Sequence, residues 1–183
     1  MANLDTPNGF SPVKSLLGAP WTALVRQYST DASKTNPIGI GDPVILAADG
    51  NVELGATNGS FLGVAVGFGA GTAQTHGGRG YFNPDNLGKQ YIAAAEAGIV
   101  AVVPVEGVLF EVQSASDLDL NVGDAADIAG STCNTTTGRS VMEITTSVNA
   151  DVKVVELVST PNNDLTLANA RYLVKFNDTE NSI

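Results

Sequence analysis

The sequence predicts an all-β protein, an antiparallel β-barrel or jelly-roll-like sandwich that carries an extended N-terminal arm. From residue 38 onward, short segments rich in Val and Ile are separated by Gly, Asn and Asp about every ten residues, which is the rhythm of strands and turns. Only two short stretches, 87–97 and 165–170, have any helical character, and Gly88 and Gly98 interrupt the first, which favours strand or turn. Prolines at positions 7, 12, 20 and 37 disfavour a long helix near the N-terminus.

We expect residues 1–35 to form the arm and residues 36–183 to form the body. The arm contains apolar side chains, among them Phe10, Val13 and Trp21, that follow neither a helical nor a strand period. A disordered tail would be poorer in such residues, so the arm is expected to bury them against another surface. A fully extended segment of this length reaches on the order of 100 Å, far enough to cross onto a neighbouring subunit.

The apolar segments of the body predict ten strands, with soft boundaries. They lie at 43–48, 51–55, 61–68, 90–95, 99–105, 107–113, 125–129, 140–148, 152–159 and 171–177.

Two turn signals join neighbouring strands. Asp49-Gly50 separates two apolar segments and predicts a β-hairpin with a type I′ turn, since Asp and Gly tolerate the left-handed backbone best. Glu106-Gly107 is expected to act similarly between strands 99–105 and 107–113.

A similar tripeptide occurs twice in the body. Ile40-Gly41-Asp42 resembles Val122-Gly123-Asp124, 82 residues further along, and each tripeptide precedes an apolar segment. Both are interpreted as a Gly-Asp corner that enters a strand. A structural pseudo-repeat is one explanation and coincidence is the other, because two tripeptides alone do not establish a repeat.

Composition bounds the class of protein. Nineteen acidic residues against nine basic ones leave a net charge of -10, which would repel a phosphate backbone and argues against a nucleic-acid partner. Charged residues are only 15%, against an ordinary level of about 25%, so Ser, Thr, Asn and Gly must cover the surface, as is common in β-rich assembly-forming proteins. No apolar stretch approaches the roughly 20 residues of a membrane helix, and residues 1–5 lack a signal-peptide pattern, so synthesis in the cytoplasm is expected.

The sequence contains few groups suited to catalysis. His76 and Cys133 are each the single residue of their type, which excludes an intrachain disulfide, and a dyad would require them to meet without any supporting pattern. The glycine-rich segment 67–80 matches neither phosphate-binding fingerprint and is interpreted as a close-packed or partner-facing loop. No spacing singles out a pair of carboxylates for glycoside hydrolysis.

Residues 117–124 place oxygen ligands at alternate positions, as a calcium loop begins. The expected glycine comes one residue late and the twelfth position is Ile128 instead of Glu. An acidic turn whose Leu118, Leu120 and Val122 face the core is therefore favoured. The chain is accordingly predicted to be neither an enzyme nor a holder of a cofactor or metal.

Aromatic residues offer one further alternative. Six of them are candidates for a platform that stacks on a sugar, although a role as core or interface anchors is favoured; they are Trp21, Tyr28, Tyr81, Phe82, Tyr91 and Tyr172.

Several short motifs resemble the head decoration (cement) proteins of tailed bacteriophages. The opening Asn8-Gly9-Phe10-Ser11-Pro12-Val13-Lys14, followed by Gly18-Ala19-Pro20-Trp21, is similar to their N-terminal segment. Gly41-Asp42-Pro43-Val44 and Phe61-Leu62-Gly63-Val64-Ala65-Val66-Gly67 are similar to segments of the same proteins, as is the alternating final strand 170–177.

This resemblance implies a homotrimer on the outside of the virion capsid, bound to the assembled icosahedral head between capsomers. The partner would be the major capsid protein, and the arm positions that carry over are Phe10, Pro12, Val13 and Trp21. Deleting residues 1–30 is then expected to leave a folded, oligomeric body that no longer binds heads.

Two other functions stay open from the sequence. One is a carbohydrate-binding or adhesive β-sandwich module on a virion surface, with Tyr81 or Tyr91 in contact with sugar. The other is a trimeric β-fold enzyme, such as a nucleotide hydrolase, with a metal at the acidic cluster 117–124.

Overall fold

The computed structural model describes residues 2–16, 20–69 and 90–179. Over these residues the regular structure consists of β-strands and one short 3-10 helix, η1 (Trp21–Leu24), without an α-helix. The strands form three antiparallel sheets, none of which closes into a barrel, so the predicted all-β class is confirmed.

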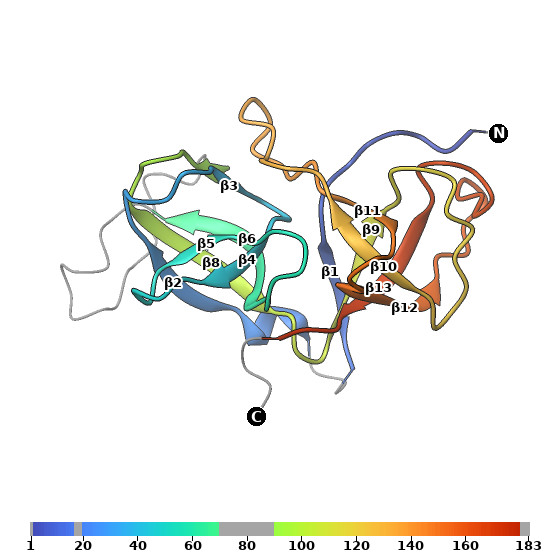
Figure 1. Ribbon diagram of the computed structural model, residues 1–183, viewed down its shortest axis with the longest axis horizontal. Helices are drawn as coiled ribbons and strands as arrows, with labels where there is room; N and C mark the ends of the chain where they lie inside the picture. Colours follow the sequence, from blue (N-terminus) through green and yellow to red (C-terminus); the bar gives the residue numbers. More distant parts are fainter. Residues whose placement is uncertain (1, 17–19, 70–89, 180–183) are drawn as a thin grey trace.

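The two large sheets occupy the two halves of the molecule (Figure 1). The six-stranded sheet has the order β1 (Ser11–Ser15), β9 (Val108–Gln113), β13 (Arg171–Phe176), β12 (Val152–Leu157), β10 (Ala125–Ala129) and β11 (Glu143–Thr146). The five-stranded sheet has the order β2 (Arg26–Thr30), β8 (Gly98–Pro104), β6 (Gly63–Gly69), β4 (Pro43–Leu46) and β5 (Val52–Leu54). A small third sheet pairs β3 (Ile38–Gly39) with β7 (Tyr91–Ile92).

Each of the ten strand segments expected from the sequence overlaps a strand of the structure. The three strands that were not expected are β1, β2 and β3. Two of these lie among the N-terminal prolines, and the third has only two residues, so none carries an alternating apolar pattern long enough to recognise.

Five strands of each large sheet form the same arrangement. We call β2, β4, β5, β6 and β8 the first unit, and β9, β10, β11, β12 and β13 the second unit. Numbered along the chain within its unit, each set of five strands has the sheet order first, fifth, fourth, second, third. The chain therefore contains two copies of one five-stranded topology.

The copies also agree in register and in their irregularities. Val44 lies opposite Gly63 in the first unit, as Ala126 lies opposite Val152 in the second. The fourth strand bulges at the same place in both units, between residues 65 and 67 of β6 and between residues 154 and 156 of β12. Such agreement in pairing indicates a genuine structural repeat, although equivalent positions in the two units mostly carry different residue types.

The Gly-Asp corners occupy equivalent places in the two units. Gly41 has φ +91° and Gly123 has φ +100°. In both corners the Asp N–H donates to the carbonyl oxygen three residues earlier, at 3.2 Å for Asp42 and 3.0 Å for Asp124, and the Asp carboxylate accepts from that same residue's N–H at 2.7 and 2.8 Å. This shared turn confirms the pseudo-repeat.

The hairpin at Asp49-Gly50 is confirmed, but its turn differs from the expected type I′. Only Gly50 has a positive φ, +83°. The Gly50 N–H donates to the oxygen of Ala47 at 2.9 Å, and the Ala47 N–H donates to the oxygen of Asn51 at 2.8 Å. These bonds close a three-residue loop in which glycine supplies the left-handed position.

The expected hairpin at Glu106-Gly107 is wrong, because β8 and β9 belong to different sheets. The turn is the corner at which the chain passes from the first unit to the second. A Gly turn signal reports only a local change of direction, and here the edge of β9 is paired with β1 instead of β8.

The N-terminal segment differs from the expected separate arm. Its two strands are built into the sheets, because β1 pairs with β9 and β2 pairs with β8. An unpaired strand edge exposes backbone donors and acceptors, and each of these strands satisfies one such edge. The segment is extended, as expected, but it lies against its own chain.

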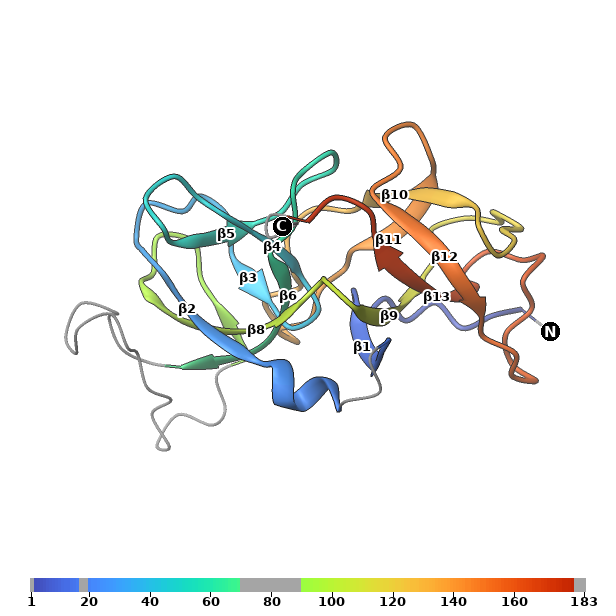
Figure 2. The same ribbon diagram turned by 90° about the horizontal axis from the view of Figure 1, so that it is seen from below.

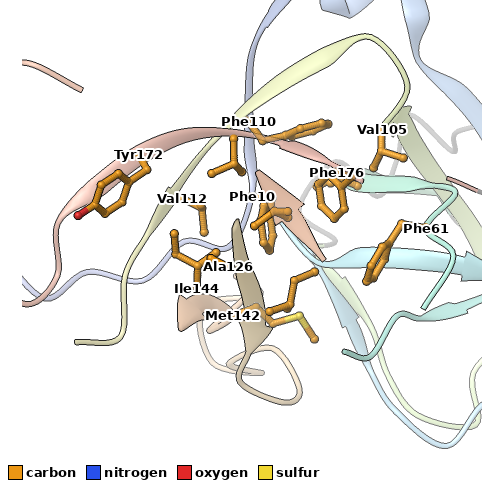
Figure 3. Close-up of a cluster of buried hydrophobic side chains, with 14 of the residues drawn as sticks. Phe10, Phe61, Val105, Phe110, Val112, Ala126, Met142, Ile144, Tyr172 and Phe176 are labelled. Atoms are coloured by element: carbon orange, nitrogen blue, oxygen red, sulfur yellow. The ribbon is translucent and has the colours of Figure 1, made fainter. Parts of the chain in front are cut away.

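Two clusters of buried apolar side chains stabilise the fold. The smaller one combines residues of the first unit, such as Val44 and Val102, with Ile38 of the small β3–β7 sheet. The larger one contains most of the buried residues of the second unit together with Phe10 from the N-terminal segment and Phe61 and Val64 from the first unit (Figure 3). The two units are therefore joined by a continuous core.

Candidate interaction surface

Phe10 lies at the centre of the contact between the two units. Its side chain is fully buried, and its ring centroid is 5.0 Å from that of Phe176 on β13. Phe176 also contacts Phe61, just before β6, and Phe110 on β9, with centroid distances of 5.1 and 5.5 Å (Figure 3). These four rings, which we call the aromatic cluster, bring together both units and the N-terminal segment.

The backbone around Phe10 is held by both units. The Phe10 N–H donates to the oxygen of Gly41 at 2.9 Å, and Arg139 donates to the Asn8 side-chain oxygen at 2.7 Å. Gly9 has φ +61°, and a Cβ there would lie 2.3 Å from the Cβ of Ser140. The structure thus assigns Phe10 to the interior of its own chain instead of an outer contact with capsid protein.

The other three arm positions lie closer to solvent. Pro12 and Val13 are on β1, where Pro12 is partly buried and 43% of Val13 is exposed. Trp21 begins η1 and is partly buried against the larger core cluster. Leu16, just after β1, is 56% exposed. Val13 and Trp21 therefore remain available as candidate contacts, although neither is fully exposed.

This arrangement changes what an N-terminal deletion tests. Removing residues 1–30 would delete Phe10 from the aromatic cluster and take away β1 and β2. Because a lost core ring and two lost edge strands destabilise the body itself, loss of head binding after such a deletion would not identify an arm contact.

An apolar groove of about 500 Å³ lies between the end of β1, η1 and the corner that joins the two units. Figure 2 shows η1 next to β1 on this side of the molecule. Leu16, Leu24 and Pro104 contribute apolar surface, and Arg26 and Glu106 add charges. Its full lining is Ser15, Leu16, Leu24, Arg26, Phe61, Leu62, Pro104, Val105, Glu106, Gly107 and Thr179.

Sequence reasoning found only part of this groove. Leu16 and Leu24 stand out as arm residues without a period, but Phe61, Pro104 and Val105 come from body strands that appear ordinary along the chain. No local pattern identifies a surface that combines the N-terminal segment, strands of the first unit and the corner at residues 106–107. The available signal was the excess of apolar side chains in the N-terminal segment.

Of the two residues considered for a catalytic dyad, the structure describes only Cys133. Cys133 is buried, and burial, followed by the negative charge of Asp42, raises the pKa of its thiol to about 11. A thiol with that pKa stays protonated near neutral pH and is a poor nucleophile. His76 lies outside the described residues, so a dyad between them is not tested.

The acidic segment 117–124 forms a turn held by its own backbone. The Asp124 carboxylate accepts from the Asn121 N–H at 2.8 Å, and Leu118 and Leu120 contact the larger core cluster as expected. Val122 does not follow this expectation, because it is 61% exposed at the tip of the Gly-Asp corner. Within residues 2–16, 20–69 and 90–179, no three His, Cys, Asp or Glu side chains gather as metal ligands do.

The aromatic residues considered as a sugar platform do not form one surface in the part of the chain that is described. Tyr172 is fully buried, and its hydroxyl donates to the Leu165 oxygen at 3.3 Å. Tyr28 and Tyr91 are partly buried on β2 and β7. Tyr81 and Phe82 lie outside the described residues.

Asp42 is the buried acidic residue of the two Gly-Asp corners. Its side chain is fully buried, and one carboxylate oxygen, Oδ1, has no hydrogen-bond partner. Burial raises its pKa to about 6, although hydrogen bonds with the Ser140 side chain and the Gly39 backbone act in the opposite direction. The equivalent Asp124 is exposed, so burial at the junction of the units distinguishes the two corners.

We expect Asp42→Asn to remove a pH-dependent loss of stability. The folded pKa of about 6 lies above the ordinary value of 3.8, so the folded protein binds this proton more tightly than the unfolded chain does. The contribution to stability is therefore largest below about pH 4 and falls by roughly 3 kcal/mol as the pH rises through 6. Urea unfolding between pH 4 and 7 should show a smaller fall for Asp42→Asn than for the wild type.

The exposed copy of the corner provides the control for this prediction. Asp124→Asn changes the same corner residue at an exposed position, and its stability should fall between pH 4 and 7 as that of the wild type does. An Asp42→Asn protein that loses stability with pH as steeply as the wild type does would contradict the assignment.

Comparison of the chain with protein-family models, with curated proteins and with solved structures gave no match. No helix in the described part of the chain has the length and apolar character needed to cross a membrane.

Proposed function

We propose that the protein is a bacteriophage head decoration protein, a homotrimer that binds the outer surface of the assembled head and bridges major capsid protein subunits. The resemblance of the Asn8–Lys14, Gly41–Val44 and Phe61–Gly67 segments to decoration proteins motivates this function. The observation that carries it here is the exposed apolar surface around the groove. Leu16 lines the groove and is 56% exposed, while Val13 on β1 and Val25, between η1 and β2, are 43% and 36% exposed.

Such a surface suits a protein that works by contact. Contiguous apolar surface on a water-facing domain is typical of a site that another protein covers. The net charge of -10 keeps a crowded assembly soluble while it favours partners that are less acidic.

The aromatic cluster holds the N-terminal segment in place at the proposed contact. Phe10 fixes the residues that precede β1, and the Leu16 N–H donates to the oxygen of Gly107 at 2.7 Å just after it. The exposed residues between these two points are therefore held in place before a partner arrives. Contacts that are already ordered lose less conformational entropy on binding, which increases affinity for a given area.

Stabilisation of the head would follow from mass action. A protein that binds only the expanded lattice stabilises it by RT ln(1 + [L]/Kd) at each site. A trimer would add avidity, because the second and third contacts form at high effective concentration.

Binding to heads tests the proposal directly. We expect Leu16→Asp to reduce co-sedimentation of the purified protein with expanded heads at least tenfold, because a charge in the groove wall must be desolvated at the contact. Val148→Asp, at a site that is 87% exposed in the second unit, is the matched control and should bind as the wild type does. Light scattering of both variants should give three times the subunit mass.

Two results would contradict this function. One is a folded wild-type protein that does not sediment with heads at any concentration. The other is a Leu16→Asp protein that binds them with unchanged affinity.

A further inference from the structure

The first strand of each unit, β2 or β9, lies at one end of the five-stranded arrangement. Comparison of the two units shows which segments pair with the outer edge of that strand. In the second unit, the outer edge of β9 holds β1 in antiparallel pairing, with Ser15 opposite Val108 and Ser11 opposite Glu111. Further along the same edge, Ser114 meets Ile144 of the third strand in a parallel bridge. One edge is thus divided between an added strand and the third strand of the unit.

The first unit has the same edge on β2. Arg26 on β2 lies opposite Val102 on β8, and Phe110 on β9 lies opposite Val174 on β13. Val102 and Val174 occupy equivalent positions, because β8 pairs with β6 in the same register as β13 pairs with β12. Residues 25–27 are therefore the equivalents of residues 109–111, which β1 covers in the second unit, whereas Leu24 ends η1.

The later part of the β2 edge is occupied, as it is in the second unit. Ser29 donates its hydroxyl to the Asn51 side-chain oxygen at 2.8 Å, beside β5. In the equivalent positions Thr30 and Ser114, both units bury a hydroxyl that has no hydrogen-bond partner. The correspondence of the two edges thus extends to the ends of their strands.

The earlier part of the β2 edge lacks the added strand. β2 is the terminal strand of its sheet in the part of the chain that is described, and Val25, Arg26 and Gln27 are exposed. Leu24 and Arg26 also line the apolar groove, so the edge and the groove are continuous.

We propose that residues 25–27 form a strand-addition site for an extended segment of a partner protein. The segment pairs antiparallel with β2, as β1 pairs with β9, and its backbone provides most of the hydrogen bonds. An apolar side chain at alternate positions enters the groove beside Leu24 and Pro104. The inference goes beyond decoration of heads, because it concerns the form of the ligand and holds whichever protein supplies it.

The charge of this chain indicates which kind of partner segment would bind. Arg26 and Glu106 both line the groove and offset each other, so the net charge of -10 on the whole chain is what favours a neutral or basic segment over an acidic one. A second copy would bring another -10 to the contact and is therefore the less favourable occupant. β1 itself fits this description, since it contains Lys14, which pairs with Glu156 on the second unit.

A peptide with the sequence of residues 9–16 is the probe. In the full chain the β9 edge is already filled by β1, so the added peptide is expected to bind the β2 edge. Trp21, the single tryptophan, lies in η1 directly before β2 and reports binding by its fluorescence. A peptide of the same sequence with N-methylated backbone amides should bind at least tenfold more weakly, because it lacks the donors for strand pairing.

Matched variants locate the site. Val25→Lys should weaken peptide binding at least tenfold, since it places a long cation at the edge, whereas Val148→Lys should leave binding unchanged. Both exposed substitutions are expected to leave the urea unfolding midpoint close to that of the wild type.

Three outcomes would overturn the proposal. They are no saturable binding of the peptide to the wild type, equal affinity for Val25→Lys and the wild type, and self-association of the chain that Val25→Lys abolishes. The last result would assign the edge to a second copy. Head binding by a Val25→Lys protein with wild-type affinity would leave the decoration function standing, so the two proposals can fail separately.

Discussion

Replacing Phe10 by alanine is expected to lower the free energy of unfolding by about 3–5 kcal/mol. The ring is fully buried between Phe176 and the surrounding core residues, and it touches elements of both units. Removing it leaves a cavity at their junction, which neighbouring strands cannot fill without breaking sheet pairing. Urea or guanidinium unfolding, followed by Trp21 fluorescence and far-UV circular dichroism, measures the loss.

Val13→Ala is the control, because it alters the same N-terminal segment at a side chain that is 43% exposed. We expect it to change stability by less than about 1 kcal/mol. A Phe10→Ala protein that unfolds at the wild-type midpoint would contradict the buried position of this ring. It would also restore Phe10 as a candidate for contact with another protein.

Gly41→Ala is expected to cost about 3–5 kcal/mol, well above an ordinary surface substitution. Gly41 has φ +91°, where any side chain is strained, and a Cβ would lie 2.3 Å from the carbonyl oxygen of Asn8. That oxygen belongs to the segment that carries Phe10, so relief of the clash would displace the aromatic cluster. The change should appear in equilibrium unfolding as a lower midpoint.

The repeat provides an internal control for this substitution. Gly123 occupies the same corner in the second unit at φ +100°, but a Cβ there would meet no atom within 4 Å. Gly123→Ala should therefore cost only the backbone strain, about 1–2 kcal/mol. If both variants lost equal stability, close approach of the N-terminal segment would have no part in the effect.

Together these substitutions test a different role for the N-terminal segment than the sequence suggested. In the structure, residues 8–15 connect the two units through a buried ring, backbone hydrogen bonds and an added strand. The Gly9-Phe10 pair that resembles decoration proteins thus has a structural reason within one chain: Gly9 permits the close approach that lets Phe10 enter the core. The proposed contact with a partner lies further along, around Leu16 and Leu24.

The local features of the fold were predictable because they depend on neighbouring residues. Strands such as β6, β8 and β12 have continuous or alternating apolar segments, and these were expected at nearly their observed positions. The Gly-Asp corners were also visible, since a positive φ favours glycine at one place in the turn. β1 and β2 were missed because their stability comes from an edge supplied by a distant strand.

The candidate surface was less predictable than the strands. Val13 and Trp21 were expected to contact a partner, and their partial exposure keeps that prediction open. Phe10 was grouped with them because an aromatic residue among prolines has the same appearance whether it enters its own core or a neighbour's. Hydrophobicity measures the tendency to leave water and contains no information about which surface receives the side chain.

The sequence by itself determined the all-β class, the positions of most strands and turns, and an acidic surface poor in charged residues. Only the tertiary structure decided that Glu106-Gly107 is a corner between two units instead of a hairpin, that the five-stranded topology occurs twice, and that Phe10 joins the copies. The physical reason is that strand propensity and turn geometry act over a few residues. Pairing partners and burial are instead set by contacts between segments far apart in the chain, whose sequences need not resemble one another.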